Sequence, residues 1–162
     1  IIIGDNGEVI FSAPGIIKSL LVTDLINGTK DIIKAGNGNN IIVGGTGDDE
    51  IDTGSDNDII LGDGGSLTFI KGTLTLAESS GPEAGDDTIR VLDGDNVVLG
   101  GAGQDTVTTT KGNDVIICDN VSLSYTSGVF AIVTSTGILV AQYFITVSYT
   151  YLTLPTTRLA SL

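Results

Sequence analysis

Gly44-Gly45-Thr46-Gly47-Asp48-Asp49-Glu50-Ile51-Asp52 and Gly100-Gly101-Ala102-Gly103-Gln104-Asp105-Thr106-Val107-Thr108 are two copies of one nine-residue pattern. Both copies have glycine at positions one, two and four, aspartate at position six and a β-branched aliphatic residue at position eight. Glycine adopts backbone conformations that other residues resist, so the first six residues suit a tight turn. The last three residues suit a short strand whose middle side chain points to one face. The pattern therefore predicts a fold of turns and three-residue strands.

The nine-residue period extends well beyond these two copies. Four consecutive copies lie in each of two blocks, at residues 26–34, 35–43, 44–52 and 53–61, and at residues 82–90, 91–99, 100–108 and 109–117. Position eight is a β-branched aliphatic residue in every copy: Ile33, Ile42, Ile51, Ile60, Ile89, Val98, Val107 and Ile116. Because the same kind of residue recurs at position eight, we expect these side chains to form a column that points into the protein.

The nonapeptides fit G-G-x-G-x-D-x-U-x, and both blocks resemble the hemolysin-type (RTX) calcium-binding repeat family. The resemblance implies an all-β fold, a parallel β-roll or β-solenoid, with Ca²⁺ held in the turns by carboxylate and carbonyl oxygens. The implied side-chain ligands occupy position six: Asp31, Asn40, Asp49, Asp58, Asp87, Asn96, Asp105 and Asp114. The implied carbonyl ligands lie near glycines of the turns: Gly36, Gly38, Gly45, Gly47, Gly54, Gly94, Gly101, Gly103 and Gly112.

In this family two nonapeptides make one coil, so alternate copies stack on the same edge. The resemblance thereby pairs position-six residues as follows: Asp31 with Asp49, Asp87 with Asp105, Asn40 with Asp58, and Asn96 with Asp114. Asparagine keeps an oxygen but lacks the charge, so we expect the asparagine-containing sites to bind calcium more weakly.

Some copies depart from the pattern, and we expect two to four filled sites. Ile26 and Asn27 stand where copy one should have glycines, Asp56 replaces a glycine of copy four, and copy five begins with Pro82-Glu83-Ala84. Asp5, Asp63 and Asp119 recur in turn-like segments, where a turn-capping role is favoured over a further ion site.

A longer repeat surrounds the nonapeptides, because the segment that starts at Ile1 recurs at Ile59 and Val115, with offsets of 58 and 56 residues. A β-prone segment interrupted by glycine follows each recurrence, as expected for a hairpin-like insert. We therefore divide the chain as follows: an insert with a partial repeat at 1–25, nonapeptide block one at 26–61, an insert at 62–81, block two at 82–117, a partial third insert at 118–137, and a divergent tail at 138–162.

The residues that flank position eight differ between alternate copies. They are mostly polar in copies one and three of each block, and all apolar in copies two and four. We therefore expect one sheet to face water and the other to be buried on both sides. The apolar side chains expected to cover the second sheet are Ile16, Ile17, Leu20, Leu21, Phe69, Leu74 and Leu76. A neighbouring repeat of the parent protein is the alternative cover.

The composition excludes several functions. The chain has 7 basic and 20 acidic residues, a net charge of −13, so nucleic acid is not an expected partner. It has no histidine, which excludes histidine-based triads and zinc sites, and its single Cys118 cannot form an internal disulfide. The apolar run 138–147 is too short to span a membrane. The oligomeric state stays open.

We predict a calcium-binding structural repeat module rather than an enzyme. Its expected partners are calcium ions and neighbouring repeats of a larger bacterial protein, and the family implies secretion, by a one-step (type I) system, with folding outside the cell. A surface-binding, adhesin-like array and a carbohydrate-active β-helix enzyme are the alternatives. Polysaccharide hydrolysis assays and cell-binding or ice-growth assays would distinguish them.

The two ends of the chain carry separate expectations. No signal peptide opens the chain, and its first residue is Ile1 rather than a start methionine, so we expect an internal fragment. Residues 147–162 resemble the translated read-through of a sequencing adapter in a metagenomic fragment, so we expect them to take no part in the fold.

Overall fold

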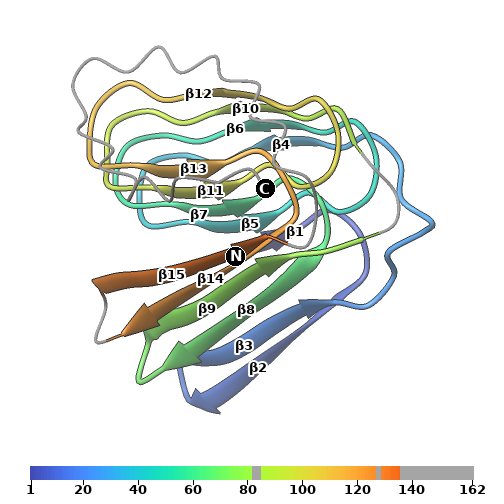
Figure 1. The fold of residues 1–162 in the computed structure, drawn as a ribbon. Coiled ribbons are helices and arrows are strands. Elements are labelled where there is room, and N and C mark those ends of the chain that lie inside the picture. The colour runs from blue at the N-terminus through green and yellow to red at the C-terminus, as the bar shows by residue number, and fades with distance from the viewer. Residues whose placement is uncertain (82–84, 127–128, 136–162) are drawn as a thin grey trace, which may run out of the picture.

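A computed structural model describes residues 1–81, 85–126 and 129–135, and the prediction for residues 147–162 concerns residues outside these ranges. The described residues form three β-sheets stacked as layers (Figure 1), and none of them lies in a helix. In particular, they contain no helix long and apolar enough to cross a membrane. The predicted all-β class is confirmed.

Two of the layers are parallel sheets of short strands. The outer parallel sheet consists, in spatial order, of β12 (Thr106–Thr108), β10 (Thr88–Arg90), β6 (Glu50–Asp52) and β4 (Ile32–Lys34). The middle parallel sheet consists of β1 (Ile2–Ile3), β5 (Ile41–Val43), β7 (Ile59–Leu61), β11 (Val97–Leu99) and β13 (Val115–Ile117). Within each nonapeptide block the chain passes alternately from one sheet to the other, with the turns between them.

The two nonapeptide blocks form one continuous stack. In the outer sheet β6 pairs with β10, which places Ile51 opposite Ile89. In the middle sheet β7 pairs with β11, which places Ile60 opposite Val98. The segment between the blocks loops out of the stack, so strands that are far apart in sequence pair without a break in register.

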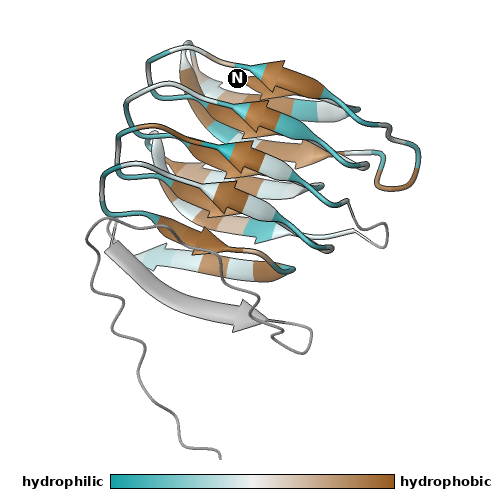
Figure 2. Ribbon diagram, turned by 90° about the horizontal axis from the view of Figure 1, so that it is seen from above, coloured by the Kyte–Doolittle hydropathy of each residue, from teal (hydrophilic) through white to brown (hydrophobic). Residues whose placement is uncertain are grey.

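The space between the parallel sheets is filled by the position-eight side chains. The most buried members of this core have at most 7% of their surface exposed: Ile33, Ile42, Ile51, Ile60, Ile89, Val98 and Val107. Ile116, on the last strand of the middle sheet, is partly buried and packs against them. The inward-pointing column predicted from the sequence is confirmed. Figure 2 shows the hydrophobic strand segments stacked one above another, with hydrophilic residues concentrated in the turns.

The third layer is an antiparallel hairpin sheet. Its strands are β15 (Val129–Ser135), β14 (Val121–Thr126), β9 (Thr73–Ser79), β8 (Gly65–Ile70), β3 (Ile16–Val22) and β2 (Gly7–Ala13). Consecutive strands form three hairpins, β2 with β3, β8 with β9 and β14 with β15, which lie side by side below the middle sheet (Figure 1).

The hairpin sheet covers the middle sheet. Val43, Leu61 and Leu99 of the middle sheet are 0% exposed. They share one cluster with residues of the hairpins: Leu20, Val22, Leu67, Phe69, Ala77, Val121 and Leu123. Ile17 and Leu74 pack against this cluster. The predicted cover is confirmed.

Not every apolar side chain expected in the cover belongs to it. Ile16 and Leu21 are 40% and 48% exposed, so this part of the expectation is wrong. Side chains of a strand alternate between its two faces, and Leu21 therefore points away from the middle sheet while its neighbours Leu20 and Val22 point toward it.

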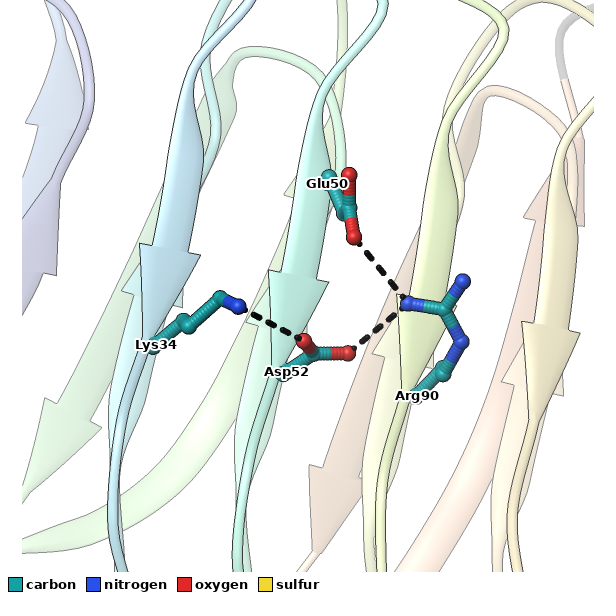
Figure 3. A network of polar contacts seen from close by, with 4 residues as sticks. All are labelled: Lys34, Glu50, Asp52 and Arg90. Carbon is teal, nitrogen blue, oxygen red and sulfur yellow. Dashed lines mark hydrogen bonds and ion pairs between the residues drawn. The ribbon is translucent and has the colours of Figure 1, made fainter.

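The outer sheet carries ion pairs on the face away from the core. Arg90 of β10 donates to Glu50 at 3.3 Å and to Asp52 at 3.0 Å, both on β6, and Lys34 of β4 lies 4.0 Å from Asp52 (Figure 3). The flanking positions of the outer strands are exposed or half-buried. This face is polar, as the sequence predicted.

Candidate calcium sites

The turns lie along two edges of the stack. One edge, here the aspartate edge, carries the position-six residues Asp31, Asp49, Asp87 and Asp105. The other, the asparagine edge, carries Asn40, Asp58, Asn96 and Asp114. The sequence predicted pairs within each block, and the structure joins these pairs into one column per edge.

Side chains on the aspartate edge link each turn to the next. The backbone N–H of Asp31 donates to Asp49 Oδ1 at 2.7 Å, and the N–H of Asp49 donates to Asp87 Oδ1 at 2.8 Å. The N–H of Asp87 in turn donates to Asp105 Oδ1 at 3.0 Å. Asp49, Asp87 and Asp105 thus each use one carboxylate oxygen to hold the preceding turn.

The asparagine edge repeats this arrangement. The backbone N–H of Asn40 donates to Asp58 Oδ1 at 2.8 Å, that of Asp58 to Asn96 Oδ1 at 2.9 Å, and that of Asn96 to Asp114 Oδ1 at 3.0 Å. Position six therefore has one role in stacking, whether it is Asp or Asn.

The second carboxylate oxygen of five stacked aspartates has no hydrogen-bond donor. The Oδ2 atoms that are both buried and without a partner belong to Asp49, Asp58, Asp87, Asp105 and Asp114. Asp49, Asp58 and Asp87 are only 1% exposed as whole residues. A buried carboxylate without a compensating charge or donor is strongly unfavourable, so these oxygens call for a cation.

Backbone carbonyls approach the same oxygens on the aspartate edge. A Cβ added to Gly62 would collide with both Asp87 Oδ2 and the Gly100 carbonyl oxygen. A Cβ added to Gly44 would collide with Asp49 Oδ2 and the Gly62 carbonyl oxygen in the same way. Glycine at position one therefore leaves open a small space that is bordered by carboxylate and carbonyl oxygens, the ligands that Ca²⁺ prefers.

Alternate turns on the aspartate edge are split by the hairpins. Gly4 lies against Asp31 in the same way that Gly62 lies against Asp87. A Cβ added to Gly4 would collide with Asp31 Oδ2 and with the Gly44 carbonyl oxygen. The hairpin that begins with β2 separates Gly4 from Asp31, and the hairpin of β8 and β9 separates Gly62 from Asp87. Each split turn rebuilds, from two distant segments, the geometry of the continuous turns.

The split turns correct the sequence alignment of copy one. Gly4 and Asp5, rather than Ile26 and Asn27, lie beside Gly44 and Gly45. Similarly, Gly62 and Asp63, which the sequence assigned to an insert, belong to the stack. The signal was present in the sequence, because a glycine follows Ile3, Leu61, Val43 and Leu99 alike, at the end of each strand.

Aspartates at position two of the split turns cap neighbouring turns. Asp63 accepts hydrogen bonds from the N–H of Ala102 at 2.6 Å and of Gly85 at 3.2 Å. Asp5 accepts from the N–H of Thr46 at 2.7 Å. The predicted turn-capping role is confirmed for both residues. The Asp63–Gly85 hydrogen bond also ties together the two ends of the hairpin segment.

Burial raises the pKa of four carboxyl groups in the turns of the aspartate edge. The pKa rises from 3.8 to about 7 for Asp49 and for Asp63, to about 8 for Asp87 and to about 6 for Asp105. Loss of hydration is the main cause in each case, hydrogen bonds from backbone N–H groups oppose it, and neighbouring carboxylates add to it. The ion pairs among the described residues involve other carboxylates, on Glu50, Asp52 and Asp93.

Most glycines singled out in the turns have backbone angles that favour glycine. The φ angle lies between 107° and 149° for the following residues: Gly38, Gly45, Gly47, Gly94, Gly101, Gly103 and Gly112. Gly36 and Gly54 are not among the residues with positive φ. Asp56, which replaces a glycine at position four, has φ of 90° and accepts a hydrogen bond from the N–H of Gly38 at 3.1 Å.

Substitution of Asp56 tests the strain in this turn. We expect Asp56→Gly to raise the free energy of unfolding in saturating calcium by about 1 kcal/mol, because glycine adopts positive φ without steric penalty. Both variants lose the exposed side-chain hydrogen bond to Gly38, whose N–H keeps the Ser55 carbonyl as acceptor. Asp56→Ala also keeps the strain, so it should be less stable than Asp56→Gly. Urea unfolding followed by circular dichroism measures both, and equal stability of the two variants would contradict the strain.

The oxygens of the turns fit calcium better than a transition metal. Within the described residues no three carboxylate or thiol groups converge on one point, so any ion must draw most of its ligands from the backbone. Carboxylate and carbonyl oxygens without nitrogen or sulfur ligands are typical of Ca²⁺. The class of protein that this arrangement defines is a stacked all-β repeat protein with oxygen-lined turns.

Comparison with protein families identifies the repeats. The model of the RTX calcium-binding nonapeptide repeat (4 copies) matches residues 34–66 and 83–116. These two segments are therefore similar to RTX calcium-binding nonapeptide repeats, a family whose repeats bind calcium ions. Comparison with curated proteins and with solved structures gave no significant match.

Proposed function

We propose that the protein is a calcium-binding structural module in which the two parallel sheets form a parallel β-roll that folds when calcium enters its turns. One observation carries the proposal. Five buried carboxylate oxygens, on Asp49, Asp58, Asp87, Asp105 and Asp114, lack any donor in the turns. Calcium would supply positive charge to these oxygens and hold successive turns together. The position-six side chains and the glycine carbonyls predicted from the sequence are the proposed ligands.

Calcium binding and folding are coupled in this proposal. Without an ion, the aspartate edge brings four position-six carboxylates into one column with buried oxygens. Three-residue strands form few contacts within themselves and depend on the neighbouring coils. Because the ligands come from separate turns, the site exists only in the folded state, and the binding free energy becomes folding free energy.

The same coupling favours a secreted, extracellular protein. Extracellular calcium modules bind with Kd of about 10⁻⁴–10⁻³ M, and we expect this range here. Such a chain stays unfolded at low calcium inside a bacterial cell and folds after export, for which a type I system is suited. Its partners are then calcium ions and neighbouring repeats of a larger protein.

A calcium titration tests the proposal. Far-UV circular dichroism of the whole 162-residue chain should show a gain of β-signal that is complete by about 10 mM calcium. Magnesium at the same concentrations should have little effect, because it demands octahedral geometry and retains its water ligands. An unchanged spectrum at 10 mM calcium, or an equal response to both ions, would refute the proposal.

The outer face gives less support to a surface-binding array. Thr106 and Thr108 of β12 are exposed, as a flat threonine face would require. The ion pairs of Arg90 with Glu50 and Asp52 interrupt this face one strand away (Figure 3). The buried carboxylates on the turns, in contrast, are explained by calcium directly.

A further inference from the structure

The two asparagines at position six make contacts that no aspartate in the columns makes. Asn40 Nδ2 donates to the carbonyl oxygens of Gly36 at 3.0 Å and Gly38 at 2.8 Å, and to Asp58 Oδ1 at 3.1 Å. The acceptors belong to its own turn and to the next one. The amide group therefore joins the inside of one turn to the stacked carboxylate of its neighbour.

Asn96 repeats the arrangement two positions along the column. Its Nδ2 donates to the Gly94 carbonyl at 3.1 Å and to Asp114 Oδ1 at 2.9 Å. Gly94 holds the same position in its turn as Gly38 does in the turn of Asn40. The same contact thus occurs in both nonapeptide blocks, and chance placement of one side chain does not explain it.

Asparagine and aspartate at position six differ in the second atom of the side-chain group. Aspartates of both columns also use Oδ1 to accept a backbone N–H. The Oδ2 atoms without a donor belong to Asp49, Asp87 and Asp105 on the aspartate edge and to Asp58 and Asp114 on the asparagine edge. In Asn40 and Asn96 the second atom of the side chain is an NH₂ group, which donates to carbonyl and carboxylate oxygens. A cation attracts the same kinds of oxygen, so the amide hydrogens satisfy acceptors that otherwise require a metal ion.

The two edges differ accordingly in charge. All four position-six residues of the aspartate edge are acidic, and Asp63 adds another buried carboxylate there. On the asparagine edge asparagine and aspartate alternate, so each aspartate neighbours a neutral amide. Repulsion between stacked carboxylates is therefore weaker on the asparagine edge.

We infer that the amide groups of Asn40 and Asn96 take the place of a metal ion in their own turns, so that the asparagine edge needs fewer calcium ions than the aspartate edge, namely those beside Asp58 and Asp114. The inference rests on the proposed function, and it goes beyond weaker binding at asparagine. The Asn40 and Asn96 turns are closed by hydrogen bonds before calcium arrives, and calcium then completes the remaining turns of both edges.

Converting asparagine to aspartate tests the inference in the full chain. Asn40→Asp replaces the donor with an oxygen that faces the Gly36 and Gly38 carbonyls. We expect the variant to bind one more calcium ion at saturation, measured by equilibrium dialysis, and to need about tenfold more calcium at the midpoint of folding. Asn39→Asp is the matched control, because it adds the same charge one residue away on an exposed side chain whose Oδ1 accepts from the N–H of Asn57.

The reverse change keeps the test decisive if Asn40→Asp fails to fold. Asp49→Asn should bind one calcium ion fewer than the wild type and should retain more β-signal in a chelator. Unchanged calcium stoichiometry in both variants, or an Asn39→Asp variant that behaves like Asn40→Asp, overturns the inference. A wild-type chain that binds no calcium would instead refute the proposed function, so the two failures are distinguishable.

Discussion

Gly62→Ala should strongly weaken calcium-induced folding. The added methyl group would collide with Asp87 Oδ2 and with the Gly100 carbonyl oxygen, which belongs to the backbone of the next coil. Inserting a methyl group into a packed site typically costs about 1–3 kcal/mol. Here the methyl group also fills the space between the oxygens proposed to bind calcium. We therefore expect the calcium concentration at the folding midpoint to rise by tenfold or more.

Gly36→Ala is the matched control for this substitution. Gly36 is a turn glycine on the asparagine edge, no atom lies within 4 Å of an added Cβ, and its φ is not positive. Alanine at such a site restricts the unfolded chain and should be neutral or stabilising by up to about 1 kcal/mol. Calcium titrations of both variants, followed by far-UV circular dichroism, make the comparison. Equal midpoints for the two variants would show that Gly62 does not border a site.

Acidification should stabilise the metal-free fold, which is the second large effect expected. The pKa of Asp87 rises to about 8 and that of Asp49 to about 7 in the folded protein, against 3.8 for the ordinary side chain. Between these values the folded state holds protons that the unfolded chain has lost. Stability therefore decreases as pH rises, since its slope with pH follows the difference in bound protons. The contribution is complete below pH about 4 and is lost as pH rises through about 6–8.

A pH titration in the presence of a chelator measures this effect. We expect the β-signal to be larger at pH 5 than at pH 8, and calcium binding at pH 7 should release protons because the ion displaces them. Asp87→Asn removes the carboxyl group with the highest of these pKa values and should weaken the dependence on pH. A metal-free β-signal that increases from pH 5 to pH 8 would show that the carboxylates are not buried without an ion.

The nine-residue period predicted most of the fold. Position eight identified the core between the parallel sheets, and the apolar flanks in alternate copies identified the sheet that needs a cover. Both predictions rest on the regular spacing of buried side chains. This spacing can be read from the sequence of a single strand, without knowledge of the strands that pair with it. For the same reason Leu21 was misassigned to the cover, because composition alone did not decide which face of its strand is buried.

The split turns and the amide contacts could not be predicted in this way. Gly62 and Asp87 belong to one turn but are separated by a hairpin, so a search for consecutive copies assigns them to different segments. The pairing of β6 with β10 across the hairpin has the same cause. Asn40 appeared as a weakened ligand, because the position of its Nδ2 beside two carbonyl oxygens depends on the folded turn.

The split turn also determines how this architecture can vary. The two ends of the hairpin segment meet at Asp63 and Gly85, whose hydrogen bond of 3.2 Å closes the loop at its base. The entropy of closing a loop grows slowly with its length, so segments of other lengths could be grafted between these residues without changing the coil beneath. A replacement must, however, bring an apolar surface of its own, because Val43, Leu61 and Leu99 would otherwise be exposed to water. We therefore expect the length and outer face of the hairpins to tolerate change, while their inner face must stay complementary to the middle sheet.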